Sequence, residues 1–287
     1  MFLSIKRIDS SLTIMQKRTN LKIWLSAIFI ACTVGLLLSA QTALSQQASL
    51  RIAAAADLQP VLPPILSQFR QSTGISVEAT YQASAALTTQ ILNAAPFDLF
   101  LSADLGYPKR LIDAGVADTA GSPDSSSPLT YARGTLVLWT RKDSHWPTPS
   151  LSTLSDPSLK RLAIANPDRA PYGRAAIAAL TSLKLIDDLK PKFVTAENIA
   201  QAAQFAETGN AEAGLISLTS ARTEHLTSVG NYFVIPRELY PPIEQGAVII
   251  TKSPNRQNAH KFLNFLLSRE IQQELAQSGL TPVKPVN

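Results

Sequence analysis

Residues 50–81 read LRIAAAADLQPVLPPILSQFRQSTGISVEATY and indicate the fold of the chain. Residues 50–55 are small apart from Leu50, Arg51 and Ile52, and they predict a strand. Apolar side chains recur at helical spacing over 62–72, and Gly74 follows as a glycine that ends a helix. Residues 75–81 then alternate as a second strand. A strand, a helix and a strand in this order predict parallel pairing in an α/β protein.

The same alternation continues to the C-terminus. Further strands are predicted at 98–102, 134–139, 161–165, 213–218 and 245–251. Further helices are predicted at 85–93, 107–114, 173–183, 198–207 and 258–276, the last as one helix with a single apolar stripe. The fold class is therefore predicted as α/β, with mainly parallel sheets flanked by helices. In such sheets, ligands bind beyond the carboxyl ends of the strands.

Length and composition bound the number of domains. The chain has 287 residues, 45% of them hydrophobic and 16% charged, which is enough for one large or two moderate domains with real cores. Disorder, collagen and coiled coil are excluded, because the apolar content is high and neither a glycine nor a heptad period is present.

The N-terminal 45 residues have the pattern of a secretory signal peptide. Lys17, Arg18 and Lys22 precede an apolar run over 23–40, and small residues at 43–45 fit a cleavage site. Two alternatives stay open. The run of 18 residues reaches the lower limit for a membrane anchor, and the chain's single Cys falls within it, where lipidation has a poor context.

Two further predictions concern this leader. The charged segment starts just after Met15, so Met15 is the predicted start of translation. If the leader were lipidated instead, Cys32 would be the modified residue. The leader also holds five of the 26 basic and one of the 21 acidic side chains.

Residues 46–287 therefore have a net charge of only +1. This charge is too small to support nucleic-acid binding through a basic surface. Residues 46–287 contain no Cys and only scattered His, so no resident cofactor or metal is expected.

Four predicted strand exits have the same character. Each carries small or capping residues just before a helix, where free backbone N–H groups attract anions. They are residues 55–58, 82–85, 170–173 and 197–200. Asn198 with Gln201 resembles a capping box there. A single exit of this kind is most simply an ordinary helix cap. Four of them, with no nucleophile, phosphate-loop or metalloprotease motif in the chain, predict a cleft that binds an anion.

Six segments together resemble the periplasmic molybdate-binding proteins of molybdenum ABC importers. They are AAAADLQPVLPPILSQF, YQASAALTTQI, APFDLFLSAD, IANPDRAPYGRAA, ENIAQAAQFAETGNAEAGLISL and LYPPIEQGAVI. The resemblance runs from about residue 50 to about 283. It implies a type II periplasmic binding protein, with lobe one at 46–132 plus 247–287 and lobe two at 133–246. The chain would cross between the lobes near 132–134 and 245–247, with the ligand in the hinge cleft.

The resemblance also implies the ligand and the residues that hold it. The ligand is molybdate or tungstate, held by neutral donors without direct protein–metal bonds. The implied residues are Asp57, Ser84, Tyr172 and Ile199, the last two through backbone N–H groups, and Ser217, with Ala56, Ala83 and Arg174 as helpers. The implied partners are a membrane permease and its cytoplasmic ATPase, for a monomeric protein in the periplasm that is not an enzyme.

Two of these positions depart from the family pattern. Asp57 stands where a serine hydroxyl often appears, and Ser217 stands where a tyrosine hydroxyl often reaches the oxyanion. We expect the Asp57 side chain to cap its own helix, since Asp is a strong N-cap residue. A carboxylate in direct contact would instead favour phosphate, so phosphate or sulfate binding stays open. An exported hydrolase and an adhesion module are the remaining alternatives, both weakened by the absence of a catalytic cluster and of aromatic platforms.

Overall fold

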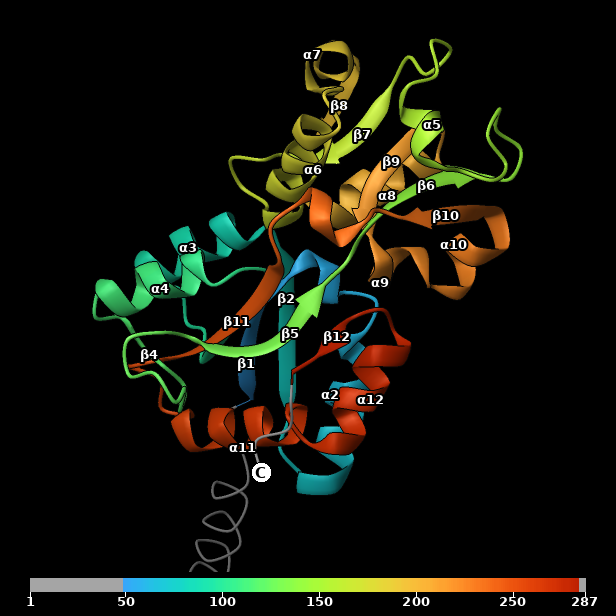
Figure 1. The fold of residues 1–287 in the computed structure, drawn as a ribbon. Coiled ribbons are helices and arrows are strands. Elements are labelled where there is room, and N and C mark those ends of the chain that lie inside the picture. The colour runs from blue at the N-terminus through green and yellow to red at the C-terminus, as the bar shows by residue number, and fades with distance from the viewer. Residues whose placement is uncertain (1–48, 284–287) are drawn as a thin grey trace, which may run out of the picture. The chain divides into compact units, whose positions relative to one another are not determined.

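The computed structural model of this protein describes residues 49–283. The predicted leader, including Met15 and Cys32, lies outside the described residues. The described chain has two lobes, each built on its own β-sheet with helices around it (Figure 1). Across residues 49–283, no helix is both long and apolar enough to span a bilayer. The predicted two-lobed α/β architecture is confirmed.

Lobe one contains a sheet of seven strands in the order β12-β5-β11-β3-β1-β2, with β4 paired to β11. These strands are β1 (Leu50–Ala55), β2 (Val77–Gln82), β3 (Leu99–Ser102), β4 (Ala117–Asp118), β5 (Leu129–Gly134), β11 (Ile243–Ile250) and β12 (Thr281–Pro282). Its helices are η1 (Ala56–Leu58), α2 (Leu62–Thr73), α3 (Ser84–Leu92), α4 (Gly106–Asp113), α11 (Arg256–Leu266) and α12 (Arg269–Gln277).

Lobe two contains a sheet of five strands in the order β10-β6-β9-β7-β8. These strands are β6 (Leu136–Arg141), β7 (Leu162–Ala165), β8 (Phe193–Ala196), β9 (Ala213–Ser217) and β10 (Gly230–Val234). Its helices are α5 (Leu151–Leu154), α6 (Pro171–Ser182), α7 (Ile186–Leu189), η2 (Lys190–Lys192), α8 (Ile199–Glu207), α9 (Leu218–Ala221), α10 (Glu224–Val229) and η3 (Arg237–Leu239).

Both sheets are mixed, and the expectation of mainly parallel sheets holds only for three strands in each. β1 pairs in parallel with β2 and β3, and β7 pairs in parallel with β8 and β9. The other strands pair antiparallel. The connection between the lobes explains one of these pairs: β5 leads out of lobe one and β11 leads back, so these two neighbours run in opposite directions.

Strand β1 shows how sequence alternation builds the core of lobe one. Leu50, Ile52 and Ala54 point into a cluster with α2, α11 and α12, whereas Ala53 points into a second cluster with α3 and α4. Successive side chains of a strand face opposite sides of the sheet, so both faces are covered by helices. Because β1 is buried on both faces, its exit at residue 55 is held rigidly.

The C-terminal apolar stripe forms two helices, so the prediction of one helix over 258–276 is wrong. Helix α11 ends at Leu266, and Ser268 begins α12 as its N-cap, with its hydroxyl accepting a hydrogen bond from the backbone N–H of Ile271. Ser is a preferred N-cap residue, and its extended backbone here breaks the helical run. Both halves still bury apolar side chains against the same sheet.

The chain passes between the lobes through neighbouring strands. β5 runs directly into β6 of lobe two, and β11 returns beside it with Ile243 opposite Gly134 (Figure 1). Because backbone hydrogen bonds join β5 and β11, these strands restrict twisting of one lobe against the other. They can still bend together, as hinge closure of the lobes requires. The carboxyl ends of β1, β2, β7 and β8 lead into the helices that face each other across this hinge.

Candidate functional site

A small cavity lies between the lobes at these strand ends, and we call it the cleft cavity. Its volume is about 10 Å³, close to the room that one water molecule needs. It is lined by Ala55, Ala56, Asp57, Gln82, Ala83, Ser84, Ala103, Ala170, Pro171, Tyr172, Asn198 and Ile199. The lobes therefore lie closely against each other around it.

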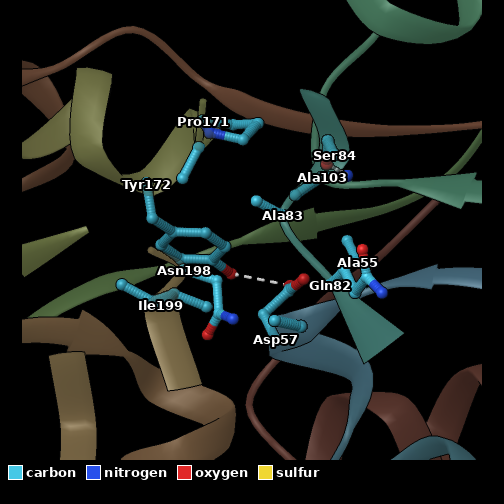
Figure 2. Close-up of a pocket in the computed structure, with 12 residues that line it drawn as sticks. Ala55, Asp57, Gln82, Ala83, Ser84, Ala103, Pro171, Tyr172, Asn198 and Ile199 are labelled. Carbon is cyan, nitrogen blue, oxygen red and sulfur yellow. Dashed lines mark hydrogen bonds between the residues drawn. The ribbon is translucent and has the colours of Figure 1, made fainter. Parts of the chain in front are cut away.

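Four of the five predicted ligand residues line the cleft cavity. Asp57 and Ser84 approach it from lobe one, whereas Tyr172 and Ile199 approach it from lobe two (Figure 2). The predicted helpers Ala56 and Ala83 line it as well. Residues that are up to 144 positions apart in sequence, Ala55 and Ile199, thus surround one small space, as the anion-cleft hypothesis requires.

Ser84 offers a hydroxyl hydrogen to the cavity. It is the first residue of α3, only 1% of its surface is exposed, and its Oγ accepts a hydrogen bond of 3.2 Å from the backbone N–H of Ala103. A hydroxyl carries one hydrogen and two acceptor positions. Because Ala103 uses an acceptor position, the Ser84 O–H can donate to a ligand oxygen.

Lobe two offers the N-termini of α6 and α8. Pro171 is the first residue of α6 and has no N–H, so the N–H of Tyr172 is the first that the helix presents. In α8, Asn198 is the N-cap and accepts a hydrogen bond of 3.0 Å from the N–H of Gln201, whereas Ile199 is the first helical residue. The first N–H groups of a helix have no acceptor within it, and they carry partial positive charge.

Gly173 allows α6 to begin where it does. A β-carbon at this position would lie 2.2 Å from the carbonyl oxygen of Ala165 at the end of β7. Only glycine permits this close approach of helix and strand backbone. The position of the Tyr172 N–H at the cavity therefore depends on the absence of a side chain at the next residue.

Asp57 does not cap its helix, so that prediction is wrong. The N-cap of η1 is Ala55, and no side chain caps it. The Asp57 carboxylate instead accepts a hydrogen bond of 3.1 Å at Oδ2 from the Tyr172 hydroxyl (Figure 2). The same oxygen accepts a second hydrogen bond from the side-chain amide of Gln245. Asp57 is 1% exposed. The hydrogen bond that it accepts from Tyr172 of lobe two takes the place of the predicted bond to its own helix.

Burial controls the protonation of this pair. Burial raises the pKa of Asp57 from 3.8 to about 6, although the hydrogen bonds from Gln245 and Tyr172 act to lower it. Burial and the neighbouring Asp57 carboxylate raise the pKa of the Tyr172 hydroxyl well above its usual value. Tyr172 therefore keeps its proton and acts only as a donor toward Asp57.

Sequence reasoning missed the Tyr172 hydroxyl, Gln245 and Gly134. Gln245 lies on β11 and is fully buried. A β-carbon on Gly134 would lie 2.2 Å from the Tyr172 hydroxyl oxygen, so this hinge glycine makes room for the phenol. The signal that could have found Gln245 and Gly134 is their place in 245–247 and 132–134, the two segments that the resemblance implies as the crossings between the lobes.

The cleft cavity offers hydrogen-bond donors without cations, beside the carboxylate of Asp57. None of its twelve lining residues is Lys, Arg or His. Over residues 49–283, no three His, Cys, Asp or Glu side chains are grouped so that they could hold a metal ion. A fully deprotonated oxyanion only accepts hydrogen bonds, and the hydroxyl and helix N–H groups suit it.

Comparison with known proteins gives the family. The sequence profile of the bacterial extracellular solute-binding proteins matches residues 50–281. The chain belongs to that family. It is 36% identical to the molybdate-binding protein ModA of Azotobacter vinelandii and 34% identical to that of Rhodobacter capsulatus, covering 84% and 79% of this chain and 92% and 86% of those proteins.

A solved structure supports the same relationship for this solute-binding protein. The periplasmic molybdate-binding protein of Azotobacter vinelandii superimposes with a TM-score of 0.75 and 28% sequence identity. The match covers 82% of this chain and all of that one. The relatives matched are named as binding proteins.

Ser217 does not line the cleft cavity of this solute-binding protein. It is fully buried at the end of β9, and its hydroxyl accepts a hydrogen bond of 3.2 Å from the N–H of Ser220 as the cap of α9. Thr219 Oγ1 lies 2.9 Å from Ser217 Oγ and donates to the carbonyl oxygen of Asp57 at 2.7 Å. The Ser217 side chain, which is shorter than the tyrosine of the family pattern, caps α9, and Thr219 makes the contact between the lobes.

Arg174 lies at the rim and not in the cavity lining. Its guanidinium forms an ion pair with Asp104 and lies 5.4 Å from the centre of the Tyr107 ring, both in lobe one. The Tyr107 hydroxyl in turn donates to the carbonyl oxygen of Asp168 at 3.1 Å. The positive charge predicted to help the anion is thus paired with a carboxylate of the other lobe.

Proposed function

We propose that this protein is the substrate-binding component of an ABC importer for molybdate. The observation that carries the proposal is the donor set of the cleft cavity, which comes from both lobes and contains no cation. The named relatives are molybdate-binding proteins. The protein would bind its substrate without transforming it and would need no resident cofactor.

Molybdate fits the chemistry of this donor set. It is a tetrahedral dianion whose four oxygens accept hydrogen bonds and donate none. The Ser84 hydroxyl and the N–H groups of Tyr172 and Ile199 would each make a charge-assisted bond, worth roughly 1.5–3 kcal/mol net. Micromolar affinity corresponds to about 8 kcal/mol. Further N–H groups of the same helix ends would supply the remainder after association costs.

Size would separate the candidate anions. Tungstate has the charge and nearly the dimensions of molybdate, so we include it as a ligand. Sulfate has shorter bonds from its central atom to oxygen, and a donor ring set for molybdate would hold it less well. The discrimination would therefore come from the spacing of rigid backbone groups at α6 and α8.

Closure would connect binding to transport. The anion would bridge lobe one and lobe two and shift the population toward the closed form, in which Tyr172 meets Asp57. We propose that a membrane permease with its cytoplasmic ATPase recognises the closed form of a monomeric protein in the periplasm. The predicted signal peptide over 1–45 supports export.

Phosphate is a second candidate, and Asp57 is the observation that favours it. Near neutral pH, phosphate keeps a proton that a carboxylate oxygen can accept. Asp57 Oδ1 is buried and has no hydrogen-bond partner within the described chain. A phosphate O–H directed at this oxygen would satisfy it.

Titration calorimetry of the mature protein with molybdate, tungstate, sulfate and phosphate tests the proposal. We expect micromolar or tighter binding of molybdate and tungstate, with sulfate and phosphate weaker by at least tenfold. Tightest binding of phosphate would establish the second candidate instead. A protein that bound none of the four anions would contradict both.

A further inference from the structure

Two buried acceptor oxygens lie without donors beside the cleft cavity. Asp57 receives both of its hydrogen bonds, from Tyr172 and Gln245, on Oδ2. Asp57 Oδ1 and Gln245 Oε1 have no hydrogen-bond partner among residues 49–283. A buried polar atom without a partner costs roughly 1–3 kcal/mol, and more where it is charged. Asp57 lines the cleft cavity, and its Oδ1 has no donor there among the described residues. The charge of this carboxyl therefore affects how an anion can bind.

Among residues 49–283, no positive side chain forms an ion pair with the Asp57 carboxylate. The ionisable side chains of the elements around Asp57 are Glu78 and Tyr81 on β2, Tyr131 and Arg133 on β5, Tyr172 and Arg174 on α6, Glu207 on α8 and Glu244 on β11, and α9 has none. Both arginines are paired elsewhere, Arg133 with Glu244 and Arg174 with Asp104. Within 49–283, Tyr172 alone among these ionisable residues is hydrogen-bonded to Asp57.

An ionised Asp57 would oppose a dianion in the same cavity. Like charges within a few ångströms disfavour each other, and the penalty grows in a buried, poorly solvated site. A protonated carboxyl removes this repulsion and gains a donor, because its O–H can point from Oδ1 toward a ligand oxygen. Oδ2 would keep both of its present hydrogen bonds.

We infer that Asp57 takes up one proton when the oxyanion binds, and that its carboxylic acid then donates a hydrogen bond from Oδ1 to the anion. The inference rests on the proposed function. The buffer acid supplies the proton, which moves to Oδ1 without any other bond changing. The position of its pKa at about 6 in the structure supports this, because a neighbouring dianion raises the pKa of a carboxyl further.

The sign of the pH dependence follows directly. Below about pH 6 the Asp57 carboxyl already carries its proton, so affinity changes little with pH. Above that value a proton must be bound together with the anion, and affinity falls as pH rises. The expected slope is about tenfold per pH unit up to the pKa of the anion complex. Molybdate itself stays a dianion throughout this range.

The substitution Asp57→Asn separates this mechanism from its alternatives. Asn has the shape of a protonated Asp: its Oδ1 can accept from Tyr172 and Gln245, and its Nδ2 can donate to the anion. We expect Asp57→Asn to bind molybdate at least as tightly as wild type at about pH 8, with affinity independent of pH. Asp187→Asn, an exposed carboxylate on α7, removes the same charge and serves as the control, with wild-type behaviour.

The test is titration calorimetry with molybdate in buffers of different ionisation enthalpy. At about pH 7.5 we expect uptake close to one proton per anion in wild type and Asp187→Asn, and none in Asp57→Asn. At about pH 5 uptake in wild type should approach zero. Tight binding of molybdate by wild type without proton uptake overturns the inference and leaves the proposed function standing. Failure of wild type to bind any of the four anions overturns the proposed function, and the inference falls with it.

Discussion

The two walls of the cleft cavity would meet a ligand with different kinds of groups. Lobe one contributes the side chains of Asp57 and Ser84, whereas lobe two contributes the backbone N–H groups of Tyr172 and Ile199. A side-chain donor disappears with a single substitution. A backbone donor survives most substitutions, because every residue except proline carries it. The lobes should therefore respond very differently to mutation.

The backbone wall is most sensitive at the glycine that positions it. Gly173→Ala places a β-carbon 2.2 Å from the carbonyl oxygen of Ala165, a backbone atom that cannot turn away. The start of α6 must shift, so we expect molybdate affinity to fall by more than about 100-fold and stability to fall by about 1–3 kcal/mol. Calorimetry and thermal unfolding measure the two effects.

Gly106→Ala is the matched control for this comparison. Gly106 likewise lies in the first turn of its helix, α4, but the nearest atom to an added β-carbon is 3.7 Å away. We expect affinity and stability close to wild type. Equal behaviour of the two variants would show that the close approach at Gly173 does not position the site.

A single backbone donor can be removed with Ile199→Pro. Proline is tolerated at the first position of a helix, and the extended backbone of Asn198 suits the residue before a proline. The variant thus loses one N–H while α8 is retained, and we expect affinity to fall by about 1.5–3 kcal/mol. Ile199→Val keeps the N–H and should bind like wild type. Loss of affinity in both variants would assign the effect to packing.

The side-chain wall is tested with Ser84→Ala. This change removes the hydroxyl donor, and we expect molybdate affinity to fall by about 1–3 kcal/mol. It also leaves the Ala103 N–H without its acceptor, so unfolding measurements should show a loss of stability. Thr89→Ala removes an exposed hydroxyl from the same helix and should change neither quantity by more than a few tenths of a kcal/mol. Unchanged affinity in Ser84→Ala would remove Ser84 from the ligand set.

The rim contact between the walls should have the smallest effect. Arg174→Ala breaks an ion pair whose arginine side chain is 44% exposed, and such pairs contribute roughly 0–1 kcal/mol. We expect a loss of affinity of less than about fivefold, reduced further by salt. Arg110→Ala removes a cation that lies over Tyr107 within lobe one, so it should not alter affinity. A larger effect of Arg110→Ala than of Arg174→Ala would contradict a role for Arg174 in joining the lobes.

Much of the site could be found from the sequence because its residues begin helices. Ser84, Tyr172 and Ile199 lie within the first two positions of α3, α6 and α8, and the small and capping residues before them mark those starts. Local sequence controls helix starts, so the resemblance and the local signals agree there. Ser217 and Arg174 lie outside the cavity lining, where Ser217 contacts Ser220 and Arg174 pairs with Asp104, and a strand-exit pattern contains no signal for these partners.

The sequence by itself determined the α/β class, most of the helices and strands, and the run of small residues that lets two walls come close. These features follow from periodicity, caps and glycines, which act over a few residues. Only the tertiary structure decided the partners of Asp57, which come from residues 115 and 188 positions away in the chain. A buried carboxylate takes whichever donors the folded lobes bring to it, since leaving it unpaired costs more than a local cap would return.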